Sequence, residues 1–154
     1  MRYEGVEALY AAVGEGHVST QSVLESVGEA AQSDGGVLVR GESGTGKEAI
    51  ARAIHLNSRR SGGPFVVLHC GLFEAAALEI ELFGHEKDAF EGASVRRKGR
   101  LELAHTGTLF VDAVGDLPVE VQDRLARFLE EGRFRRMGGT EDVVSDVRVM
   151  AGTT

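Results

Sequence analysis

The residues best suited to chemistry lie between Gly41 and Glu48, where the sequence reads Gly-Glu-Ser-Gly-Thr-Gly-Lys-Glu. This spacing matches the phosphate-binding pattern G-x-x-x-x-G-K. Glycines let the backbone curl so that its N–H groups point at phosphate oxygens, and a following helix adds its positive N-terminal end. Lys47 would add a cationic point charge for the outer phosphates. The candidate binding residues are Gly41, Glu42, Ser43, Gly44, Thr45, Gly46, Lys47 and Glu48.

The sequence on either side of this motif favours a binding loop over the plainer alternative, a glycine-rich turn without a ligand. A short apolar run at residues 37–39 predicts a strand before it, and a helical pattern through Ile54 follows it. A strand, a loop and a helix in this order are the context that phosphate binding requires. Glu48 departs from the common pattern, because a Ser or Thr hydroxyl there normally helps hold magnesium.

The rest of the chain supplies the elements that must position this loop. Continuously apolar strands that alternate with helices predict an α/β fold, with a parallel sheet covered on both faces. Residues 1–13 are expected to form a short N-terminal helix, and residues 14–154 a single core domain. The other predicted strands are 65–68, 108–111 and 147–150; the helices are 20–31, about 78–82 and 121–129, with a turn or hairpin tip at 138–139.

Composition narrows the function classes. The net charge of −7 disfavours direct DNA binding, because a nucleic-acid surface needs excess positive charge. The single cysteine, Cys70, cannot form an intrachain disulfide, which fits a reducing compartment. The N-terminus has no secretory pattern, and no apolar run approaches the about 20 residues of a membrane helix. We therefore expect a cytoplasmic protein with no membrane contact.

The whole pattern resembles one known family. The segments GESGTGKEAIARAIH, PFVVLHC, ELFGHEKDAFEGA, GTLFVDAVGDLP, VQDRLARFLEEGRFRRMGG and DVRVMAGTT are similar to the AAA+ ATPase domain of bacterial sigma-54-dependent transcription activators. The resemblance covers about residues 14–154 and includes Glu after the motif lysine as a family trait. It implies a P-loop NTPase fold, ATP and Mg²⁺ as cofactors, a ring of subunits, and sigma-54 RNA polymerase as the partner.

The chain departs from the family's pattern at its catalytic positions. By resemblance, Asp112 would hold the magnesium ion, and the next residue would be the Glu that polarises the attacking water. That residue is Ala113, and His69 replaces the Asn that pairs with the Glu. General-base catalysis contributes about 100- to 10,000-fold in rate, so hydrolysis is expected to be impaired. The alternative is that another carboxylate substitutes, and Asp116 is the nearest in sequence.

The loop that contacts sigma-54 in the family also differs here. It normally reads GAFTGA, and in this chain it is Asp88, Ala89, Phe90, Glu91, Gly92 and Ala93. Asp88 replaces a glycine and Glu91 replaces the threonine that makes the main contact, so remodelling of sigma-54 is expected to suffer. At the end of the fourth strand, Thr153-Thr154 stands where the family has Thr-Asn.

The resemblance implies four of the family's five sheet strands in this chain, without the C-terminal lid. The missing strand would cover residues 37–40, so we expect an exposed edge there that favours self-association. Because the family forms rings, the resemblance also implies a hetero-oligomer with an intact AAA+ relative as a partner. Two basic clusters are interpreted as surface or ring-interface charge rather than as a DNA site. The clusters are Arg96, Arg97, Lys98 and Arg100, and Arg133, Arg135 and Arg136.

Three functional hypotheses remain. The first is an ATP-binding regulatory module that hydrolyses poorly. The second is a truncated piece of an active sigma-54 activator ATPase that remodels RNA polymerase holoenzyme. The third is a structural fragment that binds no nucleotide.

Overall fold

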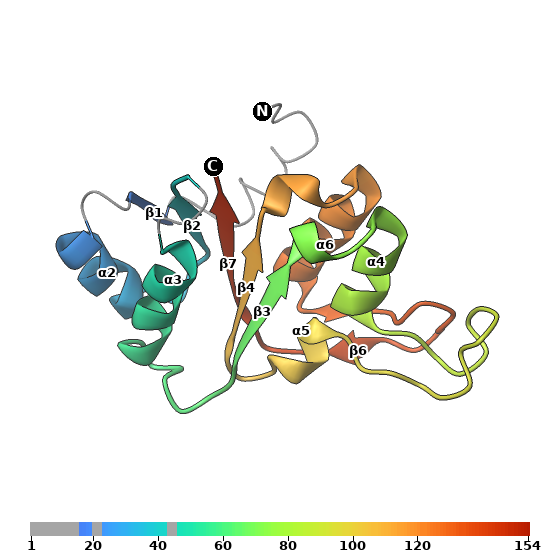
Figure 1. The fold of residues 1–154 in the computed structure, drawn as a ribbon. Helices are drawn as coiled ribbons and strands as arrows, with labels where there is room; N and C mark the ends of the chain where they lie inside the picture. The colour runs from blue at the N-terminus through green and yellow to red at the C-terminus, as the bar shows by residue number, and fades with distance from the viewer. Residues whose placement is uncertain (1–15, 20–22, 43–45) are drawn as a thin grey trace.

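The computed structural model describes residues 16–19, 23–42 and 46–154, so the helix predicted at residues 1–13 lies outside the described residues. Figure 1 shows a central sheet between two groups of helices. The chain order is β1 (Gly16–Ser19), α2 (Val23–Gln32), β2 (Val37–Arg40), α3 (Lys47–Leu56), β3 (Phe65–His69), η1 (Cys70–Leu72), α4 (Ala75–Phe83), α5 (Arg100–Leu103), β4 (Thr108–Asp112), η2 (Val114–Asp116), α6 (Val119–Glu131), β5 (Arg133–Phe134), β6 (Val143–Val144) and β7 (Arg148–Thr153), where η marks a single 3₁₀ turn.

All four strands expected from the apolar runs are present, and they are parallel. Within the described residues the sheet has the order β1-β2-β7-β4-β3. The added strand is β1, which pairs in parallel with β2 from Gly16 opposite Val37 to Ser19 opposite Arg40. The expectation that residues 37–40 form an exposed edge is therefore wrong, because β2 lies between β1 and β7. Both edges of β2 are paired, so β2 offers no free edge for self-association.

Strand pleating divides the apolar side chains between two cores. Successive side chains of a strand point to opposite faces. Val37, Val39, Phe110 and Met150 face α2 and α3, where they pack with Ile50, Ala51 and Ile54. Leu38, Leu68, Leu109, Val111 and Val149 face the other side, which α4, α5 and α6 cover. Across the described part of the chain, no helix combines the length and the apolar character that would let it cross a membrane.

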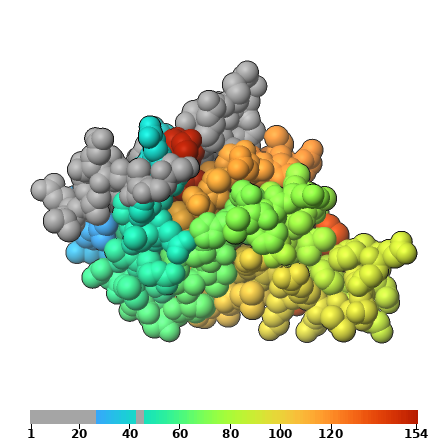
Figure 2. Space-filling model, viewed as in Figure 1, coloured from blue at the N-terminus to red at the C-terminus, as the bar shows by residue number. Residues whose placement is uncertain are grey.

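A long segment, residues 84–99, projects away from the sheet between α4 and α5 and is called the projecting lobe. Figure 1 shows this yellow-green segment beside the orange-red ribbon of β5 and β6, and Figure 2 shows it as a lobe that projects from the body. Its base is narrow, because a Cβ on Gly99 would lie 2.4 Å from the carbonyl oxygen of Leu82. His85 forms isolated β-bridges to Arg97 across the base and to Met137 between β5 and β6. The antiparallel β5–β6 pairing confirms the hairpin suggested at residues 138–139.

Charged side chains hold the end of the sheet where β7 begins. Arg60 is 9% exposed and donates to Asp34 Oδ1 at 2.7 Å and to Asp146 Oδ1 at 2.7 Å. The hydrogen bond from Arg60 is the main cause that holds the pKa of Asp34 far below its usual value. Arg148 is buried and donates to the carbonyl oxygens of Gly35 and Ala30, which joins β7 to the end of α2.

Candidate functional site

The phosphate loop connects β2 to α3 at the carboxyl edge of the sheet. Gly41 donates its N–H to the carbonyl oxygen of Thr153 at 3.0 Å, which fixes the loop's start against β7. Gly46 precedes α3 with φ 83°, a left-handed conformation that favours glycine. Among the described residues, no side-chain oxygen caps this helix, and the N–H groups of its first turn are of the kind that bind anions. Ser43, Gly44 and Thr45 lie outside the described residues, and Glu42 is exposed.

Lys47 is the cation of this loop and is held from two sides. Its side chain is 9% exposed. Its Nζ donates to the carbonyl oxygen of Gly41 at 2.9 Å and to that of Thr153 at 3.4 Å. These acceptors are neutral carbonyl groups, so the ammonium charge is oriented without being neutralised by them. A buried, oriented ammonium group is suited to bind phosphate.

Asp112 ends β4 beside this loop. Its Oδ1 accepts the N–H of Ala113 at 3.0 Å. Its Oδ2 lies 3.2 Å from Nδ1 of His69, which stands directly opposite Asp112 in the β3–β4 register. Both oxygens of the carboxylate that the resemblance assigns to magnesium are thus engaged within the protein.

His69 also contacts the first turn of α3. Its Nε2 lies 3.0 Å from Oε1 of Glu48, whose Oε2 lies 3.5 Å from Arg52. His69 therefore links a residue of the phosphate loop to the end of β4. Sequence reasoning missed this contact, because the alternation of the strands shows only that His69 and Asp112 share a face and does not place Glu48 beside them. His69 and Asp112 share the strand face of Val67 and Phe110, which is the face that α3 covers.

These donors do not fit a resident magnesium ion. Mg²⁺ requires near-octahedral oxygen ligands at about 2.0–2.1 Å. Here an imidazole stands between the two carboxylates of Glu48 and Asp112, and each of them is already bonded to it. Among the described residues, no group of three or more His, Cys, Asp or Glu side chains is arranged to hold a metal.

Ala113 is the residue that the resemblance places at the family's catalytic Glu. Its backbone is left-handed, with φ 55° and ψ 49°, and its methyl group packs against the core on the α4–α6 side. A methyl group neither orients water nor accepts a proton. Asp116, the possible substitute, is the last residue of η2. Its charge affects the pKa of Cys70, which belongs to that same core. Burial, assisted by Asp116 and Asp112, raises the pKa of the Cys70 thiol to about 12.

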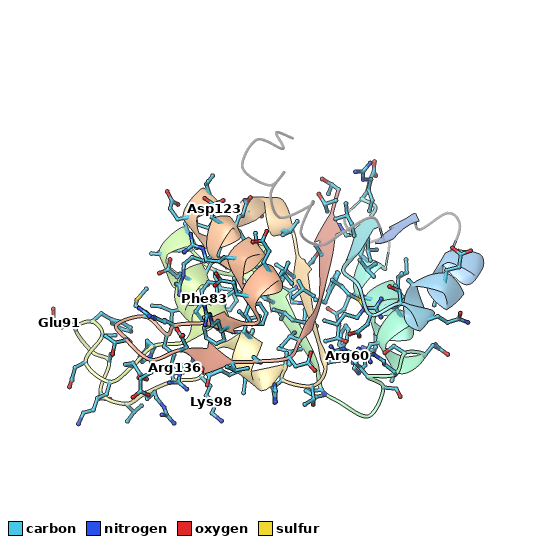
Figure 3. The ribbon with its side chains drawn as sticks, turned by 180° about the vertical axis from the view of Figure 1, so that it is seen from behind. Arg60, Phe83, Glu91, Lys98, Asp123 and Arg136 are labelled. Atoms are coloured by element: carbon cyan, nitrogen blue, oxygen red, sulfur yellow. The ribbon has the colours of Figure 1, made fainter. Side chains whose placement is uncertain are left out.

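The loop of residues 88–93 forms a tight turn at the end of the projecting lobe. Asp88 donates its N–H to the carbonyl oxygen of Ala93 at 2.8 Å. Asp88 has φ 65° and Gly92 has φ 94°, so the turn uses two left-handed residues. Phe90 is 41% exposed, and its ring lies 4.9 Å from that of His85. Figure 3 shows Glu91 at the outer tip of the loop and Arg136 nearer the body.

Most arginines of the two basic clusters are paired with carboxylates. The ion pairs are Arg97 and Arg100 with Glu81, Arg133 and Arg135 with Asp142, and Arg136 with Glu86 and Glu102. Arg136, which lies between β5 and β6, thereby joins this hairpin to the base of the projecting lobe. This pairing supports the interpretation of the clusters as structural surface charge.

Comparisons with known proteins agree with this geometry. A family model described as the sigma-54 interaction domain matches residues 13–154. The regulatory protein AtoC of Escherichia coli (strain K12) is 46% identical over 143 residues, which cover 90% of this chain and 31% of AtoC. The crystal structure of NtrX from Brucella abortus in complex with ATP is 38% identical with a TM-score of 0.78, covering 86% of this chain and 28% of that one.

A more distant likeness bears on the fold alone. The P-loop NTPase domain of a sigma-54 transport activator from E. coli is 20% identical with a TM-score of 0.53, covering 83% of this chain and 69% of that one. Together these likenesses confirm the predicted P-loop NTPase fold. The chain spans less than a third of the length of AtoC and of NtrX.

Proposed function

Because this chain belongs to the family of sigma-54 interaction domains, found in sigma-54-dependent transcription activators, we propose that it binds ATP without turning it over efficiently. In this proposal it acts as a nucleotide-binding regulatory module. The binding residues are those of the phosphate loop, Gly41 to Glu48. The impaired step is hydrolysis, because His69 and Ala113 replace the Asn and the catalytic Glu that the resemblance implies.

The observation that carries the binding proposal is the setting of Lys47. Its buried ammonium group is held by Gly41 and Thr153 at the N-terminus of α3. Charge-assisted hydrogen bonds to a phosphate contribute about twice as much as neutral ones. The similarity to NtrX, whose structure was solved with ATP, supports the same ligand class here.

The proposal of impaired hydrolysis rests on Ala113 and His69. Loss of a general base removes about 100- to 10,000-fold in rate. His69 is bonded to Glu48 and Asp112, so in this arrangement it is not free to replace the missing carboxylate. Because His69 stands between the carboxylates of Glu48 and Asp112, the donor set does not fit the family's magnesium ion, and the proposed nucleotide binding does not rely on it.

A regulatory role follows if nucleotide binding changes what the module contacts. The family's partner is sigma-54 RNA polymerase, and the corresponding loop is residues 88–93. Asp88 and Glu91 add two carboxylates to that loop, so we expect a weakened contact. An intact AAA+ relative in a mixed ring is the other partner we propose. A cytoplasmic location belongs to this proposal, because both partners act there, and no direct DNA contact is part of it.

The second candidate is a segment of an active activator that remodels RNA polymerase. It is kept because the chain spans only 31% of AtoC, so a longer protein would contain parts absent from this sequence. This candidate requires another residue to position the attacking water. Phosphate release by the longer protein would favour it.

The binding proposal is tested with a fluorescent ATP analogue and competition by ATP, ADP and AMP. The backbone of a phosphate loop and its lysine hold the phosphates beyond the α-phosphate, so ATP and ADP should displace the analogue and AMP should not. Equal competition by AMP would show that the nucleoside, not the loop, determines binding. No signal change with any nucleotide would contradict the proposal and favour the structural fragment.

A further inference from the structure

One imidazole joins two carboxylates that come from different elements. His69 lies at the end of β3, Glu48 in the first turn of α3, and Asp112 at the end of β4. The distances are 3.0 Å from Nε2 to Glu48 Oε1 and 3.2 Å from Nδ1 to Asp112 Oδ2. Both ring nitrogens are therefore used, one for each carboxylate.

The bridge follows from the fold rather than from a flexible side chain finding a partner. The register places His69 opposite Asp112 on neighbouring parallel strands. The pleat directs both toward α3, and the phosphate loop brings Glu48 to the same place. All three side chains are partly exposed, at 41% for His69, 39% for Glu48 and 29% for Asp112, so a soluble ligand can reach them.

The bridge disfavours a divalent cation between the two carboxylates for two reasons: the imidazole occupies the space, and its nitrogens are poor ligands for magnesium. A cation between the two carboxylates would have to displace the imidazole, because the ring already occupies the line between them. A neutral imidazole donates to one of the two carboxylates in either tautomer, and the protonated ring donates to both. Magnesium prefers oxygen ligands and dehydrates reluctantly, so a ring nitrogen is a poor replacement for a carboxylate oxygen.

We propose that His69 takes the place of the magnesium ion between Glu48 and Asp112, so that the phosphate loop binds nucleoside di- and triphosphates without a divalent cation. This inference rests on the proposed nucleotide binding and adds the form of the ligand. Lys47 and the N–H groups at the start of α3 then face the phosphate charge without a metal. The ligand class is the metal-free nucleotide.

The first experiment measures ATP affinity in excess EDTA and in excess Mg²⁺ for the unaltered chain and for His69→Asn. The asparagine removes the bridge and, at a partly exposed position, should leave the fold unchanged, which circular dichroism checks. The two affinities of the unaltered chain should agree within about threefold. For His69→Asn, Mg²⁺ should tighten binding by about tenfold, the scale of an outer-shell effect on a metal site. A tenfold gain from Mg²⁺ in the unaltered chain would overturn the inference.

The second experiment needs no nucleotide, so it separates this inference from the binding proposal. Free Mn²⁺ is followed by electron paramagnetic resonance in the presence of the unaltered chain, of His69→Asn, and of His69→Asn with Glu48→Gln. Removal of the imidazole should raise Mn²⁺ affinity by about tenfold, and the added Glu48→Gln should reverse the gain. Equal Mn²⁺ affinity in the first two proteins, whether measurable or absent, would overturn the inference. A chain that binds no ATP in the first experiment contradicts the proposed function, and the Mn²⁺ result alone then decides the bridge.

Discussion

The ammonium nitrogen of Lys47 lies 3.4 Å from the carbonyl oxygen of Thr153, a residue 106 positions further along the chain. Thr153 also accepts the N–H of Gly41 at 3.0 Å. The end of β7 therefore fixes both the first residue of the phosphate loop and its cation. The sheet, and not the loop alone, positions the candidate site.

Replacing Lys47 with alanine should weaken ATP binding by about tenfold or more. The reason is that a hydrogen bond to a charged group contributes about 1.5–3 kcal/mol, and 1.4 kcal/mol corresponds to a factor of ten. Isothermal titration measures the change. Arg52→Ala is the matched control. Arg52 is an exposed cation of the same helix, and it pairs with Glu48 at 3.5 Å. Equal losses in the two variants would mean that general charge, not the lysine's position, governs binding.

Replacing Thr106 with glycine should stabilise the chain by about 1 kcal/mol. Thr106 is exposed and has φ 72°, a region that costs a β-branched residue strain and a glycine none. Urea unfolding measures the difference. Ala53→Gly in the middle of α3 is the control and should cost about 1 kcal/mol. A loss of stability in Thr106→Gly would argue against the described turn before β4.

Stability should fall in acid partly because of Asp34. Its hydrogen bonds and ion pairs with Arg60 and Arg59 hold its folded-state pKa below the unfolded value of about 3.9. The contribution is therefore complete above about pH 4 and is lost as the pH falls below that value toward the folded pKa. Urea unfolding between neutral and acidic pH should show a weaker pH dependence for Asp34→Asn, which also starts from a lower stability. Parallel curves for the two proteins would contradict this assignment.

Restoring the family residues in the projecting loop should strengthen contact with sigma-54. The double variant Asp88→Gly and Glu91→Thr removes two exposed carboxylates and gives the left-handed position at residue 88 a glycine. We expect about tenfold tighter binding to purified sigma-54 in the presence of a non-hydrolysable ATP analogue, the size expected when the minority of interface side chains that contribute more than about 1 kcal/mol is restored. Glu130→Thr, at an exposed position of α6, is the control for the removal of surface charge alone. An equal gain from that control would assign the effect to net charge.

Much of the fold could be predicted because its signals are local. The apolar runs of β2, β3, β4 and β7 and the glycine-rich loop lie in continuous stretches, where pleat and helix periods can be read directly. The strand β1 could not be predicted in this way. Its sequence, Gly-His-Val-Ser, has no apolar run, and it forms because the edge of β2 offers backbone partners. Tertiary pairing outweighs local propensity there.

For the same reason, only part of the candidate site could be predicted from the sequence. The motif of Lys47 and the loss of the Glu at Ala113 are visible in the sequence. The contact of His69 with Glu48 depends on the side of β3 that faces α3, which is a property of the packed sheet. The two substitutions at positions 69 and 113 could be noticed separately, but the role of the histidine as a bridge emerges only from the positions of three elements.

ATP binding without efficient turnover is measured by calorimetric titration of the chain with ATP, with phosphate release followed on the same sample. We expect saturable binding, weakened by about tenfold or more in Lys47→Ala, with phosphate release no faster than that of the Lys47→Ala sample. Phosphate release that depends on Lys47 and proceeds at a rate typical of ATPases would contradict it, because another residue would then position the attacking water in place of Ala113.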